Sequence, residues 1–146
     1  GIRVGLSAAK AISLSLGKSL YGYSNFKAML HQAIIDKKMP LNKKINLLIK
    51  SSKHDFYCQR YSEGKFEKIS LNNVDGIKKN HNKENHYLGN FNNIYNLQNY
   101  HKCIPSKDSI LKIVHANDLL KANYLDKRLK PYYIKEHYAK KSREKK

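Results

Sequence analysis

The tripeptide Gly17-Lys18-Ser19 is the first place where residue types and spacing could support chemistry, because it matches the end of a phosphate-binding loop. Such a loop needs a second glycine five residues earlier, where this chain has Ile12. It must also open a helix, so that backbone N–H groups point at the phosphate. Gly17 instead ends an apolar helical pattern. The tripeptide therefore does not predict a nucleotide-binding site.

The histidines and acidic residues are the next candidates for chemistry, and their spacing is equally weak. None of the seven histidines forms a pair at the i,i+4 spacing of a helical zinc-peptidase site. His101 and Cys103 lie two apart on an expected strand and do not complete a metal pattern. His54 and Asp55 would point to opposite faces of a strand, which places them poorly for acid–base catalysis. We expect no catalytic residues, no metal and no cofactor.

The excess of basic residues is the strongest signal in the composition. Lys and Arg number 29 against 11 Asp and Glu, which gives a net charge of +18. This charge suits a partner that carries phosphates, such as RNA, and some of the 11 tyrosines could stack on its bases. The basic residues are, however, spread along the chain with abundant Asn, Ile and Tyr, as the bias of an AT-rich gene would produce. A stand-alone basic RNA-binding module stays an alternative.

The size and the apolar runs limit the class of protein. A length of 146 residues with 40% hydrophobic residues suits one domain or two small lobes. Lys10 and Lys18 interrupt the longest apolar run, so no segment is long enough to span a membrane. The first residues also lack the pattern of a secretory signal. Cys58 and Cys103 are isolated and make no disulfide framework. We expect a cytoplasmic protein with no membrane partner.

The first forty residues predict a helix, a short strand and a second helix. Residues 3–16 are apolar or small on several faces, which is typical of a helix that is buried or shared between subunits. Gly17 is a natural end for this helix, and residues 20–23 suit a strand. Ser24 is an N-cap for the next helix, which stops before Pro40. The apolar stripe of the second helix is Phe26, Met29, Leu30, Ala33 and Ile34.

The rest of the chain predicts a sheet with connecting helices. Residues 45–50, 54–62 and 66–71 suit an antiparallel meander, with a tight turn at 63–65. Later segments suit a polar loop at 78–86, a strand at 87–89, a weak helix at 90–100 and strands at 101–104 and 131–135.

Pro105 and Ser106 open the clearest late helix, before a highly charged tail. One face of this helix carries Ile110, Ile113, Val114 and Leu120. The element order βββαβαβα is that of a ribonuclease-H-like unit, whereas the segment before it corresponds only to the end of such a unit.

The segment "GIRVGLSAAKAISLSLGKSLYGYSNFKAM" resembles a conserved stretch of the TsaB (YeaZ) family. The family pattern is T-G-[IL]-R-[IV]-G-[LV]-[AS]-x-A-K-[AG]-[IL]-[AS]-L-x-L-G-x-x-L-x-G-[VI]-S. It is matched at Gly1, Arg3, Gly5, Ala9, Lys10, Gly17, Gly22 and Ser24. Weaker similarities follow in "INLLIKSSKHDFYCQRYSEG", "YLGN" and "LKPYYIK". The resemblance thus covers about residues 1–136 and is strongest over the first 24.

The resemblance implies an α/β architecture of the actin-like, ribonuclease-H-like (ASKHA) class. Residues 1–40 would be the C-terminal part of a first lobe, 41–136 a complete βββαβαβα second lobe, and 137–146 a basic tail. The family pattern has further elements before the position of residue 1, so a truncated, split or degraded version of the family is expected. The family's Asp-Ala-Arg is replaced here by Ser51, Ser52 and Lys53.

The resemblance also implies a role without catalysis. Members of the family are accessory subunits in the synthesis of N6-threonylcarbamoyladenosine in tRNA, and they pair with a larger TsaD-type paralogue. The expected partner is therefore such a paralogue, with tRNA reached indirectly through the complex, although the chain could also form a homodimer. Peptidase activity is not expected. The expected interface lies on the first helix and consists of Arg3, Val4, Ala8, Ala11 and Ile12.

Overall fold

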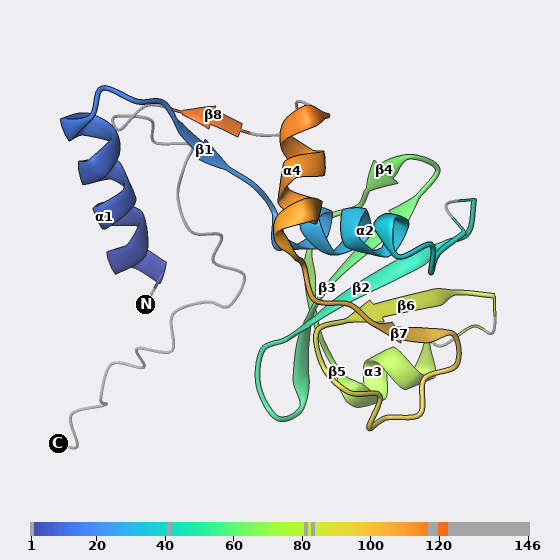
Figure 1. Ribbon diagram of the computed structural model, residues 1–146. Helices are drawn as coiled ribbons and strands as arrows, with labels where there is room; N and C mark the ends of the chain where they lie inside the picture. Colours follow the sequence, from blue (N-terminus) through green and yellow to red (C-terminus); the bar gives the residue numbers. More distant parts are fainter. Residues whose placement is uncertain (1, 41, 81, 83, 117–119, 123–146) are drawn as a thin grey trace, which may run out of the picture.

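The protein is a mixed α/β structure with a separate N-terminal helix (Figure 1). The computed structural model describes residues 2–40, 42–80, 82, 84–116 and 120–122. The helices are α1 (Ile2–Ser15), α2 (Asn25–Ile35), α3 (Val74–Lys79) and α4 (Lys107–His115). The strands are β1 (Leu20–Gly22), β2 (Ile45–Lys50), β3 (Asp55–Ser62), β4 (Lys65–Phe66), β5 (Ser70–Asn73), β6 (His86–Gly89), β7 (Tyr100–Lys102) and β8 (Leu120–Ala122).

The main sheet has six strands in the order β4-β3-β2-β6-β7, with β5 also paired to β3. The strand β2 lies in the middle, antiparallel to β3 and parallel to β6, and β6 is parallel to β7. The expected meander is thus confirmed, and the later strands add to its other side. The expected strand over 66–71 divides into β4 and β5, since one extra residue between them shifts the pairing with β3 from Tyr61↔Phe66 to Cys58↔Ser70.

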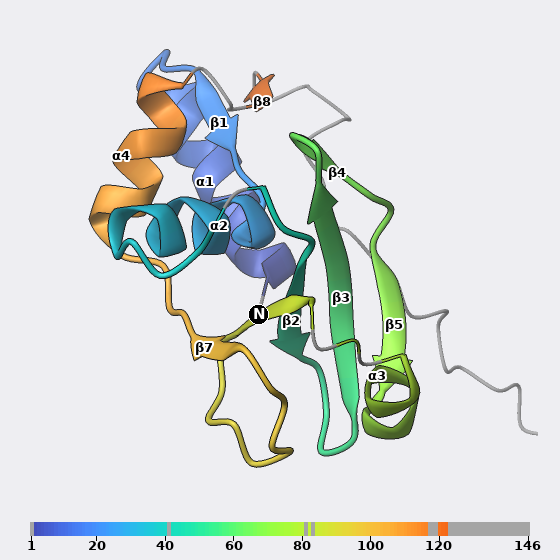
Figure 2. The same cartoon turned by 90° about the vertical axis from the view of Figure 1, so that its right-hand side faces the viewer.

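The two faces of the main sheet are covered differently. On one face, α2 packs its apolar stripe against β2 and β6, and α4 packs on α2 (Figure 2). Leu47 and Leu88 are fully buried there, as the apolar pattern of β2 predicts. On the other face, α3 and the loop 90–99 cover a cluster around Leu48, Phe56 and Phe91. Burial of both faces holds these strands together as one unit.

The second helix follows the sequence closely. The Ser24 side chain accepts a hydrogen bond from the backbone N–H of Phe26 at 3.2 Å, as expected for an N-cap. Four of the five predicted stripe residues are buried, namely Phe26, Met29, Leu30 and Ala33. The fifth, Ile34, is 39% exposed because it lies at the border of the packed face.

The expected weak helix at 90–100 is wrong. Residues 91–99 form turns, in which the Asn93 side chain replaces helical hydrogen bonds. Its Oδ1 accepts from the Leu97 N–H and its Nδ2 donates to the Leu97 carbonyl, each at 2.9 Å. Asn96 and Asn99 have φ values of 55° and 53°, the left-handed region that asparagine tolerates best after glycine. The asparagines of this segment thus select turns over a helix.

Two other boundaries differ from the prediction. The helix α4 has the expected Ser106 N-cap and buries Ile113, but it ends at His115, and Leu120 begins the strand β8. Residues 78–79, expected in a loop, close α3, whose N-cap is Asn73. The predicted strand at 131–135 and the basic tail lie outside the described residues.

Candidate functional site

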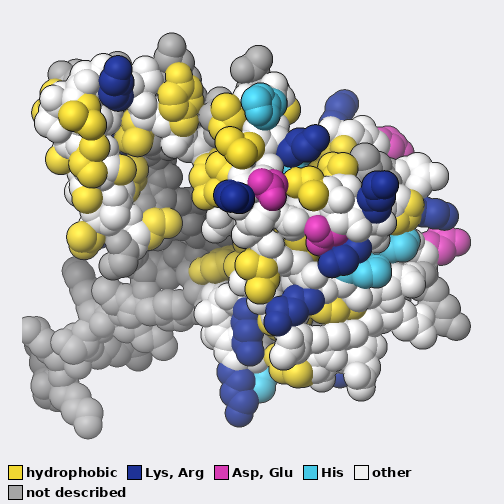
Figure 3. All heavy atoms as spheres, viewed as in Figure 1, with side chains coloured by type: hydrophobic (Ala, Val, Ile, Leu, Met, Phe, Trp, Pro, Cys, Tyr) yellow, Lys and Arg dark blue, Asp and Glu magenta, His cyan; other side chains and the backbone are white. Residues whose placement is uncertain are grey.

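The helix α1 is the most unusual surface of the described protein, because apolar side chains are exposed along it. Ile2, Val4, Ile12, Leu14 and Leu16 are 54–72% exposed. Figure 3 shows hydrophobic side chains along this helix, which stands beside the sheet. Burial of α1 within the described residues, one of the two outcomes that the sequence predicts, is therefore wrong.

Only one narrow side of α1 is shielded from solvent. Leu6, Ala9 and Lys10 are half-buried and Ser13 is buried, and these positions recur at helical spacing. The helix reaches the rest of the chain through β1, which pairs with β8 in a two-stranded sheet. A helix held on one side by so few residues keeps its other faces in solvent.

The residues predicted as a partner interface all lie on the exposed part of α1. Arg3, Val4, Ala8, Ala11 and Ile12 are each exposed. Their positions at i, i+4, i+7 and i+8 place Val4, Ala8, Ala11 and Ile12 on one face. The short side chains of Ala8 and Ala11 form the centre of this face, and the larger side chains of Val4 and Ile12 project at its ends. Such a shape allows the backbone of another helix to approach closely.

The end of α1 is fixed by Gly17, as the sequence predicts. Gly17 has φ +58°, and its N–H donates to the Leu14 carbonyl, while the N–H of Lys18 donates to the Ser13 carbonyl. These bonds satisfy carbonyl groups that a helix end otherwise leaves without a partner. Gly17-Lys18-Ser19 thus ends a helix, which is the opposite of what a phosphate-binding loop requires.

A second group of polar residues lies at the carboxyl ends of the parallel strands β2, β6 and β7. Asn90, directly after β6, accepts a hydrogen bond through Oδ1 from the Lys50 N–H at 3.1 Å. Lys102, at the end of β7, donates through Nζ to Asn92 Oδ1 at 2.9 Å. Lys50 and Lys102, which are 52 positions apart in the sequence, therefore lie at the same edge of the sheet.

The turn between β2 and β3 completes this edge. It contains Ser51, Ser52 and Lys53. The N–H groups of Ser51 and Ser52 donate to the Asp55 carbonyl, and Ser52 Oγ donates to Asp55 Oδ2 at 2.9 Å. The Tyr95 hydroxyl donates to the Lys53 carbonyl at 3.1 Å and ties the turn to the loop 90–99.

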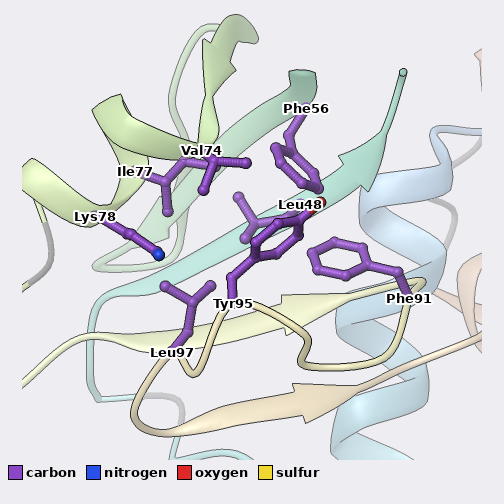
Figure 4. A pocket seen from close by; sticks show the side chains of 8 residues that line it. All are labelled: Leu48, Phe56, Val74, Ile77, Lys78, Phe91, Tyr95 and Leu97. Atoms are coloured by element: carbon purple, nitrogen blue, oxygen red, sulfur yellow. The ribbon is translucent and has the colours of Figure 1, made fainter. Parts of the chain in front are cut away.

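An apolar cleft with a volume of about 10 Å³ lies between α3 and the loop 90–99 (Figure 4). Its walls include Phe56, Phe91 and Tyr95, whose rings contact one another at centroid distances of 4.9–6.0 Å. Lys78 lies at its border. Because ligand pockets usually measure ~300–1,000 Å³, this cleft is a feature of packing. This cleft was not predicted from the sequence, although aromatic residues that alternate with asparagine are typical of packed turns.

A second, more open hollow with a volume of about 80 Å³ lies on the α3 face of the sheet. Asn46, Arg60 and Cys58 are among the residues that line it. The guanidinium of Arg60 already has two partners within the chain. Its Nε donates to Asn46 Oδ1 at 3.2 Å, and its Nη1 lies 3.8 Å from Glu67 Oε1. Desolvation raises the pKa of the Cys58 thiol, which keeps this group protonated and weakly nucleophilic at neutral pH.

The buried titratable groups serve packing. Burial raises the pKa of Tyr100 to about 12, and its hydroxyl donates to the Phe91 carbonyl. Burial, with a smaller effect of Asp36, raises the pKa of Cys103 to about 11, and its Sγ lies 3.2 Å from the Met29 carbonyl oxygen. The pKa of His86 is lowered, mainly by desolvation and to a smaller extent by the nearby His101.

Within the described residues, no group of three or more His, Cys, Asp or Glu side chains is arranged to hold a metal ion. In the same part of the chain, no helix combines the length and the apolar content that crossing a bilayer requires.

Comparison with known proteins gives a likeness of fold. No family model matches the sequence, and no curated protein matches it either. Among solved structures, the chain is similar to an uncharacterized protein with similarity to peptidase YEAZ from Pseudomonas aeruginosa. The TM-score is 0.67 at 10% sequence identity, and the match covers 92% of this chain and 68% of that one. The protein therefore has a YeaZ-like fold.

Proposed function

We propose that this protein is a non-catalytic accessory subunit of the TsaB type, which pairs through α1 with a larger TsaD-type paralogue in tRNA threonylcarbamoyladenosine synthesis. The observation that carries the proposal is the exposed apolar surface of α1, on a chain with a YeaZ-like fold. The order of the main sheet, with β2 antiparallel to β3 and parallel to β6, also agrees with the second lobe of an actin-like protein.

The energetics favour a covered α1. Val4 and Ile12 are 72% and 58% exposed. Removing each from water would contribute on the order of 1–2 kcal/mol, since full burial of such a side chain contributes ~1.5–3 kcal/mol. Apolar residues exposed over adjacent turns mark an interaction site more often than single exposed residues do.

The charge of the arm, which we define as α1 and β1 (residues 2–23), favours a heterologous partner over a second copy. The arm contains Arg3, Lys10 and Lys18 and no acidic residue. Two arms packed against each other would bring six positive charges together, with no carboxylate of the arm between them. A partner with an apolar helix flanked by Asp or Glu would instead complement this surface.

Co-purification tests the proposal. A tagged TsaD-type paralogue, co-expressed with this chain, should retain it on an affinity column. The variant Ala8→Glu places a carboxylate at the centre of the α1 face. Ile12→Glu places one at an end of the same face. Each should reduce the retained fraction at least tenfold, because a charge buried without a partner strongly opposes association.

Ile104→Glu is the matched control. Ile104 is 61% exposed, close to the 58% of Ile12, but it follows β7 in the main sheet. This variant should be retained like the wild type. Equal loss with Ile104→Glu and Ile12→Glu, or no retention of the wild type, would contradict pairing through α1. Sedimentation of the chain alone tests the homodimer, which the charge argument predicts to be weak.

A further inference from the structure

We propose that the carboxyl edge of the main sheet is a phosphate-backbone-binding surface for RNA, formed by Lys50, Lys53, His54 and Lys102. This patch, called the edge patch below, lies far along the sequence from α1 and does not depend on the proposed pairing. Figure 3 shows a column of dark-blue side chains over the region where β2, β7 and the β2–β3 turn meet.

The strand pairing places the cations of the edge patch together. Leu48, Gly89 and Lys102 stand in one row across β2, β6 and β7. Lys50 lies two residues beyond Leu48 on the same face, since side chains alternate along a strand. Neighbouring strands are ~4.8 Å apart and the rise is ~3.3 Å per residue, so the backbones of Lys50 and Lys102 are separated by roughly 12 Å.

The lysines of the edge patch are available to an external anion. Lys50, Lys53 and Lys102 are exposed, and none forms an ion pair with a carboxylate among the residues that the structure describes. The acidic residue nearest in sequence, Asp55, accepts a hydrogen bond from Ser52 Oγ through its carboxylate. His54 is also exposed, and its ring N–H can donate a hydrogen bond to a phosphate oxygen.

The backbone under the edge patch is held in place. The Lys50 N–H is bonded to Asn90, the Lys53 carbonyl to Tyr95, and the His54 carbonyl to the Val74 N–H at 3.0 Å. Three lysines on a fixed frame therefore keep their spacing, which lowers the entropy lost when a rigid polyanion binds.

The groups between the lysines favour RNA over a membrane. Asn90 and Asn92 are exposed amides, which can donate to phosphate oxygens, to sugars or to base edges. Insertion into a membrane interface would also require apolar side chains beside the lysines. The carboxyl ends of parallel strands are also where open α/β sheets commonly bind ligands.

Fluorescence anisotropy with a labelled tRNA transcript tests this surface on the full chain alone. The variant Lys50→Ser/Lys53→Ser/Lys102→Ser removes three charges from the edge patch. The control Lys65→Ser/Lys68→Ser/Lys112→Ser removes three exposed lysines from β4, from the β4–β5 connection and from α4. Both variants have the same net charge, so their comparison separates a local surface from the general excess of lysine.

The edge variant should bind the transcript at least tenfold more weakly than the wild type at 100 mM salt, and the control less than threefold more weakly. The slope of log K against log salt should fall by about 2 in the edge variant, at ~0.7–0.9 per lost phosphate contact. Unfolding curves check that both variants are folded.

Equal weakening by both variants would overturn the proposal, because binding would then follow net charge. It is also overturned if the wild type does not bind the transcript, or if it binds phosphatidylserine vesicles and not RNA. Ile12→Glu should bind RNA like the wild type, so the outcome here is independent of pairing through α1.

Discussion

Leu47 in β2 and Leu14 in α1 are the same residue type in two apolar segments, yet their surroundings are opposite. Leu47, on the face of the main sheet that α2 covers, is 0% exposed, whereas Leu14 is 54% exposed. The same contrast holds for whole regions, since residues 24–116 form two buried clusters while the arm buries only Ser13. The main sheet is therefore stabilised by its own contacts, and the arm has apolar surface left for another molecule.

The largest expected difference between the two regions is that between the variants Leu47→Ala and Leu14→Ala. Leu47→Ala removes a fully buried side chain and should lower the free energy of unfolding by about 3 kcal/mol, within the ~2–5 kcal/mol typical of such changes. Leu14→Ala should change it by less than ~0.5 kcal/mol. Urea unfolding followed by circular dichroism gives both values, and similar losses would mean that α1 is packed in solution.

The pair Gly89→Ala and Gly5→Ala should give effects of opposite sign. A Cβ on Gly89 would lie 2.7 Å from Tyr100 Cε2 and 2.8 Å from Phe91 Cε1, so we expect a loss of about 2 kcal/mol, as for other overpacked sites. A Cβ on Gly5 would meet nothing within 4 Å. Alanine there should stabilise α1 by up to ~1 kcal/mol, because alanine favours helix more than glycine does.

Hydrogen exchange of the α1 amides measures the effect of Gly5→Ala directly, and urea unfolding measures that of Gly89→Ala. Slower exchange in α1 with an unchanged unfolding midpoint would sharpen the distinction between the two regions. Destabilisation by Gly5→Ala would indicate that α1 is packed against another part of the chain.

Tyr100→Phe should cost about 1 kcal/mol near pH 8, because it removes the hydrogen bond to the Phe91 carbonyl and leaves that acceptor without this donor. The pKa of Tyr100 in the folded protein, about 12, exceeds the ordinary tyrosine value of 10.0. Between these values the unfolded chain loses the proton while the folded chain keeps it, so the wild type loses stability as the pH rises.

The stability difference between wild type and Tyr100→Phe should accordingly shrink above pH 10. Urea titrations at pH 8, 9 and 10.5 test this dependence, since the phenylalanine variant shares every other titrating group. A constant difference over this range would mean that the hydroxyl is as well solvated in the folded protein as in the unfolded one.

Local signals predicted much of the main sheet. The apolar run of β2, the alternation in β3 and the caps Ser24 and Ser106 each depend on residues close in sequence, and each lies where the sequence placed it. The turn at Glu63 and Gly64 has positive φ at both residues, as a tight hairpin connection requires.

The wrong helix at 90–100 has a local cause, the hydrogen bonds of Asn93, whereas the other failures came from features that depend on partners far along the chain. The exposure of α1 could not be read from its composition, because an apolar helix looks the same whether or not other elements cover it. The pairing of β1 with β8 joins segments with no common sequence signal. The edge patch likewise needs the register of β2, β6 and β7, which brings Lys50 and Lys102 to one edge.

The pairing of β1 with β8 has a consequence for the order in which the protein folds. Leu20 is aligned with Ala122, so this small sheet closes a loop of about a hundred residues that contains the whole main sheet. Closing that loop before the main sheet has folded would cost chain entropy, and only three aligned residue pairs compensate for it here. The ladder should therefore form last and open first, which would let the N-terminal helix swing outward while the rest of the molecule stays native.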